Sequence, residues 1–241
     1  MRAILTYHSI DDSGSVISVT AERFAEHVRF LASSGVRVLS VNDLLAHDDG
    51  SPAVAITFDD AFTNFATAAW PLLRDRGFPV TVFVPTRHVG ATNRWSAIPG
   101  GDMPELPVMD WDALARLSEE GVALGAHTRT HADLRQLDPA AVRDEVEGSF
   151  DDIARATGRR PTGFAYPYGY FNEAVVRETE RWSRWACTTL LGPLGSTVDA
   201  HRLPRLDAYF FRGRSALNAY GTRRFSAYIA VRAAIRRLRR S

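Results

Sequence analysis

The stretch AVAITFDD, residues 53–60, sets the plan of this chain. Its apolar first half predicts a buried strand, because a short uninterrupted apolar run is typical of a strand covered on both faces. Such a strand would deliver two adjacent carboxylates, Asp59 and Asp60, at its C-terminal end. Taken alone, the pair indicates a helix cap as readily as a reactive site, since Asp60 could cap a helix that begins near Phe62.

Composition limits the classes of protein that remain. The 241 residues are 45% apolar, which fits one large α/β domain with a sizeable core. Twenty-eight acids face 29 bases, so the formal charge of +1 does not call for nucleic acid, and we expect no nucleic-acid partner. A single cysteine, Cys187, excludes an intrachain disulfide and a multi-cysteine zinc site, and we interpret it as a small core residue.

The N-terminus has no charged region followed by a long apolar stretch, so we expect no signal peptide. No window approaches the roughly 18 to 20 apolar residues that a membrane span needs. The sequence therefore predicts a cytoplasmic protein, with a peripheral position at the inner membrane face as the alternative.

Apolar runs alternate with amphipathic segments along the chain. Strands are expected at residues 3–7, 36–41, 53–56, 79–84, 122–126, 163–166 and 186–190, and helices at residues 21–32, 61–75, 111–120, 139–156 and 172–182. The alternation predicts parallel strands joined by crossover helices. Because polar residues of interest follow the ends of strands, we predict a barrel of about seven strands with its site at their C-terminal ends.

The long irregular stretch at residues 86–109 is rich in glycine and proline. A loop of that length inside a compact domain is usually functional. We interpret it as a wall of the site, with Trp95 as a substrate contact.

His127 and His131 lie four residues apart, which on a helical turn places both imidazoles on one face. The alternative is two unrelated surface histidines. A zinc-protease motif would need Glu after the first His, but Thr128 stands there, so the carboxylates must come from Asp59 and Asp60. Two imidazoles and one carboxylate suit a divalent ion such as zinc, and the second carboxylate could then take a proton from the bound water.

Residues 57–60, 127–131 and 166–169, read as TFDD, HTRTH and YPYG, resemble the first three motifs of the polysaccharide deacetylases, also known as the NodB-homology or carbohydrate esterase family 4 enzymes. The resemblance covers roughly residues 1–210. It implies a distorted (β/α) barrel that removes an N-acetyl group from an amino sugar. Residues 1–210 would be the catalytic barrel and residues 211–241 an Arg-rich helical tail.

The resemblance also implies roles for single residues. Asp59 would be the general base, while Asp60, His127 and His131 would bind a divalent metal ion, for which we expect zinc. The backbone N–H of Tyr168 would help to hold the oxyanion.

Further assignments concern substrate contacts and support of the metal site. We assign substrate contacts to Pro167 and Tyr168 of the third motif, together with Trp95. Thr128 would support the metal site by hydrogen bonding.

Two residues of the family pattern, an Arg and a His, are missing from their usual positions, and other residues must take their roles. Many members carry Arg two residues before the third-motif Pro, where this chain has Ala165, and we expect Arg205 to supply the missing guanidinium. The general-acid His of the fifth motif has no clear match. His8, at the end of the first strand, is preferred to His201, and a Tyr-His pair there resembles the deacetylases of exopolysaccharide biosynthesis.

The fourth motif is also indistinct. Trp182 and Trp185 could wall the pocket, although packing between a helix and a strand is the interpretation we favour.

The C-terminal segment, residues 208–241, has nine Arg and no acid. It contains an apolar stripe at helical spacing, formed by Tyr228, Val231, Ile235 and Leu238, and flanked by Arg232, Arg236, Arg239 and Arg240. The stripe could pack on the barrel, or it could form an interfacial helix attracted to anionic lipids.

Three functions are compatible with the sequence. The first is metal-dependent deacylation of an amino sugar in a polysaccharide or glycan precursor, including a deformylase or deacetylase of a lipid-linked sugar. The second is a carbohydrate-binding protein that has lost catalysis, for which Ala165 and the absent fifth-motif His argue. The third is a scaffold held at the membrane by its tail.

Overall fold

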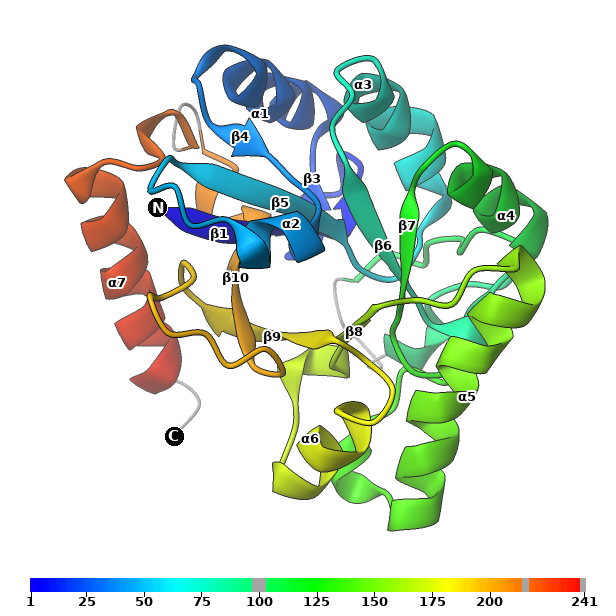
Figure 1. Cartoon of the computed structure of the whole chain (residues 1–241). Coiled ribbons are helices and arrows are strands. Elements are labelled where there is room, and N and C mark those ends of the chain that lie inside the picture. The colour runs from blue at the N-terminus through cyan, green and yellow to red at the C-terminus, as the bar shows by residue number, and fades with distance from the viewer. Residues whose placement is uncertain (97–102, 214–216, 239–241) are drawn as a thin grey trace.

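Seven parallel strands close into a ring in the computed structural model, which describes residues 1–96, 103–213 and 217–238 (Figure 1). In order around the ring they are β1 (Arg2–Tyr7), β5 (Ala53–Phe58), β6 (Val80–Val84), β7 (Ala123–Ala126), β8 (Gly163–Ala165), β9 (Trp185–Leu191) and β10 (Leu203–Asp207). β10 pairs with β1 and thereby closes the ring. The predicted barrel is confirmed.

Shorter strands and a shell of helices complete the fold. β4 (Arg37–Val38) pairs with the start of β5, and β2 (Ser9–Ile10) pairs with β3 (Ser18–Val19). The α-helices are α1 (Ala21–Ser33), α2 (Val41–Ala46), α3 (Trp70–Arg74), α4 (Trp111–Glu119), α5 (Pro139–Thr157), α6 (Glu173–Thr179) and α7 (Arg223–Leu238). The short helical turns are η1 (Phe65–Ala69), η2 (Thr86–His88), η3 (Arg94–Ser96), η4 (Leu134–Gln136), η5 (Pro167–Gly169), η6 (Ala208–Phe211) and η7 (Leu217–Ala219).

Strand residues alternate between the inside of the ring and the helical shell, as the pleat of a strand requires. One buried cluster combines alternate positions of the ring strands and includes Ile4, Ala55, Phe83, Ala165 and Cys187. Their sequence neighbours belong to the larger cluster that faces the helices. Asp59 continues the inward-facing positions Ala53 and Ala55 of β5. Its side chain therefore enters the barrel at the end where the strands have their C-terminal ends.

Large and small residues are matched inside the ring. Phe83 and Trp185 meet edge to face with ring centres 6.0 Å apart. A Cβ at Gly125 would lie 2.5 Å from the Phe83 ring, and one at Gly163 would lie 2.1 Å from Trp185. The two aromatic rings can fill the barrel only because these glycines face them.

Polar side chains and a glycine cap the ends of the helices. The carboxylate of Asp110 accepts a hydrogen bond from Ala113 N–H at the start of α4, and Asn172 caps α6 in the same way. Gly158 ends α5 in the left-handed conformation at φ 69°.

The structure corrects two expected elements and adds one that was not expected. The strand expected at residues 36–41 is shortened to β4, because Ser40 caps α2 and Val41 is the first residue of that helix. The helix expected at residues 61–75 is divided into a π-helical turn and α3 near Pro71. β10 was not expected at all.

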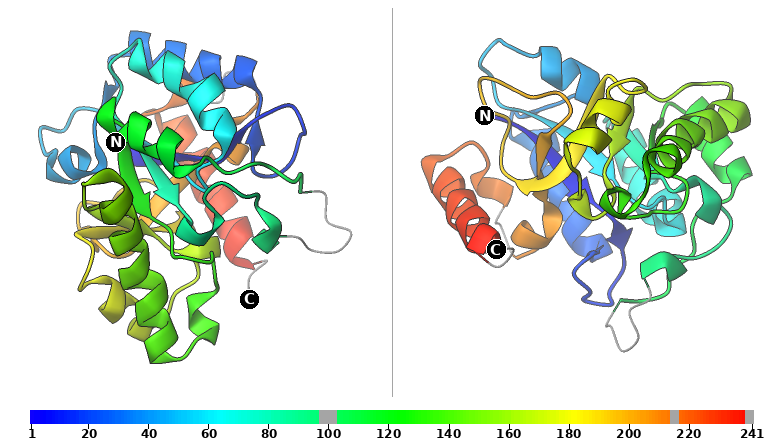
Figure 2. Two further views of the ribbon diagram at one scale, coloured as in Figure 1. Left: turned by 90° about the vertical axis from the view of Figure 1, so that its right-hand side faces the viewer. Right: turned by 90° about the horizontal axis from the view of Figure 1, so that it is seen from below.

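Helix α7 lies on the outside of the ring (Figures 1 and 2). It packs through Phe225 and Ile229, which are each 2% exposed. The residues of the predicted apolar stripe, Tyr228, Val231, Ile235 and Leu238, are 38% to 78% exposed. Of the two alternatives for this stripe, packing of the whole stripe on the barrel does not hold, while Arg239 and Arg240 lie outside the described residues.

None of the helices in the described segments is long and apolar enough to cross the bilayer.

Helix α1 contributes a buried histidine whose charge opposes folding. The hydroxyl of Tyr7 and Nδ1 of His27 lie 3.0 Å apart, and burial lowers the pKa of His27 from 6.5 to about 4. Between those pH values the unfolded chain binds the proton and the folded chain does not, so protonation favours unfolding. We expect the titration of His27 alone to lower the unfolding free energy by about 3 kcal/mol as the pH drops from 6.5 to 4.

Urea unfolding at a series of pH values measures this dependence. The variant His27→Gln should lose most of it, because Gln does not titrate, whereas His201→Gln at a half-exposed position should keep it. Identical pH profiles for wild type and His27→Gln would contradict the prediction.

Candidate active site

The backbone is strained where the three motifs lie. The described residues other than glycine that adopt positive φ angles, between 53° and 71°, are Asp60, Ala61, Thr128, His131 and Tyr168. Such conformations cost roughly 1–3 kcal/mol each and persist only where the surrounding structure fixes them. Their concentration at the C-terminal ends of β5, β7 and β8 marks this face of the barrel as the site.

Asp59 is held by a buried arginine from the opposite end of the sequence. The guanidinium of Arg205, on β10, donates to both carboxylate oxygens of Asp59 at 2.7 Å, and its Nε donates to the carbonyl of Thr188. Burial would raise the pKa of Asp59, but Arg205 and, to a smaller extent, His8 hold that pKa well below its usual value. Asp59 is thus ionised, and Arg205 occupies the place where the sequence argument expected a guanidinium.

Asp60, His127 and His131 form a compact donor set. The Nε2 atoms of His127 and His131 lie 3.6 Å and 3.4 Å from Oδ1 of Asp60, and one ligand atom from each residue lies within 4.8 Å of the others. Oδ1 of Asp60 is buried and has no hydrogen-bond partner in the described chain. A buried carboxylate oxygen without a partner is costly, and a cation between these atoms would satisfy it.

The protonation states also suit a metal ion. Nδ1 of His127 lies 2.7 Å from the carbonyl oxygen of Ala165, so Nδ1 carries the hydrogen and Nε2 keeps its lone pair toward Asp60. Burial and the neighbouring His127 lower the pKa of His131 well below its ordinary value, which keeps that ring neutral. Ala165, which lacks the expected guanidinium, therefore serves the site through its backbone.

The two histidines do not lie on a helical turn, so that part of the sequence argument is wrong. Residues 127–131 form a loop after β7. Thr128 and His131 both have left-handed backbones, and the Oγ1 of Thr128 accepts a hydrogen bond from His131 N–H at 2.9 Å. This tight loop brings the ring centres to 4.8 Å, and Thr128 braces it by hydrogen bonding as expected.

Glu145, on α5, is a supporting residue that the sequence argument missed. Its carboxylate accepts hydrogen bonds from the backbone N–H groups of Arg129 and Thr130 at 2.8 and 2.9 Å, and from the hydroxyl of Thr130 at 2.6 Å. It thereby fixes the histidine loop from the helical shell. The available signal was an acid on the apolar face of the expected helix, next to Val142 and Val146.

His8 and His201 are clearly separated. Nε2 of His8 lies 3.7 Å from Oδ2 of Asp59, at the end of β1. His201 precedes β10, at the N-terminal ends of the strands, and its Nε2 lies 3.1 Å from the carbonyl of Ser183. Of the two, the structure brings only His8 to Asp59.

The third motif forms a tight turn beside the histidines. The N–H groups of Gly169 and Tyr170 donate to the carbonyls of Tyr166 and Pro167. The ring of Tyr168 lies 4.7 Å from that of His131, and its side chain is 40% exposed. Pro167 itself is buried beneath the turn.

Trp95 also lies against the site. Its ring centre is 5.1 Å from His131 and 4.4 Å from His88. Residues 97–102 of the expected wall lie outside the described part of the chain.

Trp182 and Trp185 are packing residues, as we favoured. Trp185 is buried in the ring and donates its indole N–H to Asn42, whereas Trp182 donates to Glu178 of α6.

The fold and the site define an α/β-barrel protein with a two-histidine, one-carboxylate cluster beside an ionised carboxylate. The family model described as polysaccharide deacetylase matches residues 46–183, which is more than half of the chain. The chain therefore belongs to the polysaccharide deacetylase family, which confirms the resemblance seen in the three motifs.

Individual relatives and structures agree with this assignment. YxkH of Bacillus subtilis, named as a polysaccharide deacetylase, is 25% identical over 90% of this chain and 75% of its own length. The poly-beta-1,6-N-acetyl-D-glucosamine N-deacetylase of Staphylococcus epidermidis is 21% identical over 78% of this chain and 67% of its own length. The structure of the Streptococcus pyogenes deacetylase PplD in complex with acetate has the same fold, with a TM-score of 0.72 and 22% identity, covering 85% of this chain and 91% of PplD.

Other relatives are much longer than this chain. The chain spans 30% of a chitin deacetylase from Arthroderma benhamiae and 5% of a gellan lyase from a Bacillus species. The activities named for these longer proteins are therefore not assigned to this chain.

Proposed function

We propose that this protein is a metal-dependent hydrolase that removes an N-acetyl or similar N-acyl group from an amino sugar in a polysaccharide or glycan precursor. The observation that carries the proposal is the Asp60, His127 and His131 cluster, with its partnerless carboxylate oxygen, next to the ionised Asp59. The names of the relatives, which include sugar-polymer deacetylases, support the choice of substrate.

The metal would be held by Asp60, His127 and His131, and we propose zinc, because two neutral imidazoles and one carboxylate are a donor set typical of that ion. A divalent ion held there supplies a Lewis acid for the amide carbonyl and for the water that attacks it.

The residues around this cluster would divide the proton transfers. Asp59, ionised and oriented by Arg205, takes a proton from the attacking water. His8 gives a proton to the departing amine. The backbone N–H of Tyr168 donates to the oxyanion, while Pro167 fixes that turn and Trp95 contacts the sugar. Arg205 acts through Asp59 and is a positioning residue.

The two sequence observations that favoured a binding protein without catalysis no longer argue for it. That alternative rested on the missing third-motif Arg and the missing fifth-motif His, and Arg205 and His8 both lie at Asp59. A cytoplasmic location remains our proposal, with contact at the inner membrane face through the exposed stripe of α7 as its extension.

Acetate release tests the proposed function directly. The zinc-loaded chain should release acetate from poly-β-1,6-N-acetylglucosamine or tetra-N-acetylchitotetraose. EDTA should abolish the release, and added zinc should restore it. Inactivity of the zinc-loaded chain on both polymers, on their N-formylated analogues and on an anionic N-acetylated glycan such as hyaluronan, or activity that survives EDTA, would refute the proposal.

A further inference from the structure

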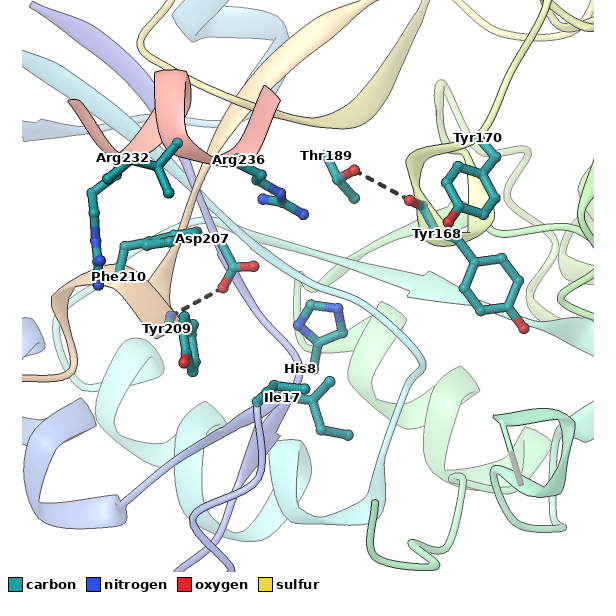
Figure 3. Close-up of a pocket in the computed structure, with 12 residues that line it drawn as sticks. His8, Ile17, Tyr168, Tyr170, Thr189, Asp207, Tyr209, Phe210, Arg232 and Arg236 are labelled. Carbon is teal, nitrogen blue, oxygen red and sulfur yellow. Dashed lines mark hydrogen bonds between the residues drawn. The ribbon is translucent and has the colours of Figure 1, made fainter. Parts of the chain in front are cut away.

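A pocket of about 510 Å³ opens between His8 and α7, on the face of the barrel that carries the site (Figure 3). Its volume lies within the range of roughly 300–1,000 Å³ that is usual for small-molecule sites. Its walls are partly aromatic, from Tyr168, Tyr170, Tyr209 and Phe210. Flat rings at the mouth of a polar site offer apolar faces to a sugar ring.

Positively charged residues outnumber negatively charged ones in the described lining of this pocket. Arg232 and Arg236 enter its lining from α7, and Asp207, at the end of β10, is the one carboxylate among the described lining residues. Figure 3 shows the Arg236 side chain extending from α7 toward the pocket. The described lining residues therefore carry an excess of positive charge in a partly apolar setting, where a charge interacts more strongly than in water.

Arg232 lines the pocket with one hydrogen-bond donor left without a described partner. Its guanidinium carbon lies 5.4 Å from the ring centre of Phe210, which orients the group. Its Nε is buried and has no hydrogen-bond partner among the residues that the structure describes. Guanidinium groups match phosphate and carboxylate oxygens in geometry and charge.

The pocket is continuous with the catalytic residues. His8 lines it and lies 3.7 Å from Asp59, and Tyr168 lines it and contacts the ring of His131. A group bound here would thus be a neighbour of the reacting amide. Both arginines lie outside residues 46–183, the segment matched by the family model.

We propose that this pocket binds a negatively charged group, a phosphate or a carboxylate, carried by the amino-sugar substrate, with Arg232 and Arg236 as its cationic contacts. The proposal rests on the deacylase function proposed above and narrows its substrate to anionic glycans or phosphorylated sugars. Helix α7 would then form one wall of the active site and favour substrates that carry a negative charge.

Calorimetric titration of the full chain tests the proposal without requiring turnover, when an Asp59→Asn background prevents consumption of the probes. Two matched pairs of probes separate the sources of charge: N-acetylglucosamine 1-phosphate against N-acetylglucosamine, and a hyaluronan tetrasaccharide against tetra-N-acetylchitotetraose. We expect at least one anionic probe to bind about tenfold more tightly than its neutral partner, and this preference to weaken with salt. The pair that shows it identifies phosphate or carboxylate as the natural group.

Substitutions on α7 locate the preference. Arg232→Gln and Arg236→Gln should each weaken binding of the preferred anion about tenfold and leave the neutral probes unchanged. Arg232→Lys, which keeps the charge, should retain most of the preference. Arg224→Gln is the matched control, because Arg224 is an exposed residue of the same helix outside the pocket lining.

Three results would overturn the proposal. The first is equal affinity for the charged and neutral members of both pairs. The second is an anion preference that survives Arg232→Gln and Arg236→Gln together while thermal unfolding shows the helix intact. The third is unchanged sugar binding in those variants with reduced binding to phosphatidylglycerol vesicles, which would assign the arginines to a membrane surface. Acetate release is a separate measurement, so its absence from neutral and anionic substrates alike would count against the deacylase function alone.

Discussion

Asp59→Asn should lower kcat by about 10³-fold to 10⁴-fold, the upper part of the range for loss of a general base. The amide keeps the size of the carboxylate and one oxygen for Arg205, but it cannot accept the proton of the attacking water. Because Asp60, His127 and His131 are untouched, zinc binding should persist. Acetate release and metal content, measured on the same preparation, test both halves of this expectation.

A surface variant provides the comparison. Asp48→Asn replaces an exposed aspartate in the loop after α2 and should leave kcat unchanged. If Asp59→Asn turned over like Asp48→Asn, Asp59 could not be the base. Loss of zinc together with activity would instead assign Asp59 to the metal.

Arg205→Met should destabilise the folded chain by about 3–5 kcal/mol, the usual cost of removing one partner of a buried ion pair. Arg205 and Asp59 are each 3% exposed and share two short hydrogen bonds. Without the guanidinium, the carboxylate would remain buried without a counter-charge, and its pKa would rise. Urea unfolding of the metal-free chain measures the loss.

A double-mutant cycle separates this charge effect from lost packing. Asp59→Asn combined with Arg205→Met should be less destabilised than Arg205→Met alone, because no uncompensated charge remains. Arg202→Met, in which a surface pair with Glu173 and Asp199 is lost, should cost no more than about 1 kcal/mol. Additive effects of the Asp59 and Arg205 substitutions would show that the two residues are not coupled. Should Arg205→Met fail to fold, recovery of folding in the double variant would still measure the coupling.

The parts of the site that could be predicted are local in sequence and follow strands. A buried apolar run ends at Asp59 and Asp60, and each of the other two motifs also begins where a strand ends. The parity of β5 already places Asp59 inside the barrel. Local patterns of this kind give the architecture and most of the donor set.

β10 could not be found in the same way, because Pro204 cannot donate to a sheet and argues against an interior strand. The structure accommodates it through an irregular register with β9 between Leu203 and Arg205. The sequence pattern therefore did not predict β10, the strand that carries Arg205. Arg205 itself could still be proposed as the partner of Asp59 because of its charge.

Periodicity misled in two other places. The four-residue spacing of His127 and His131 suggested a helix, but two left-handed residues produce the same proximity in a loop. On α7, the stripe that begins at Tyr228 has helical spacing, yet Phe225 and Ile229 are the residues that pack. Spacing shows which residues share a face, but it does not show which face the rest of the chain covers.

The Asp59–Arg205 pair also has a consequence for how the molecule assembles. The two residues are 146 positions apart in sequence, so the pair can form only after β10 has been added between β1 and β9. During synthesis, the strand that bears Asp59 emerges long before its partner, and the ring stays open for most of that time. Pairings of such long sequence separation make folding slow. Closure of the barrel and pairing of Asp59 with Arg205 are therefore one late event, and a nascent chain that has not reached β10 has neither.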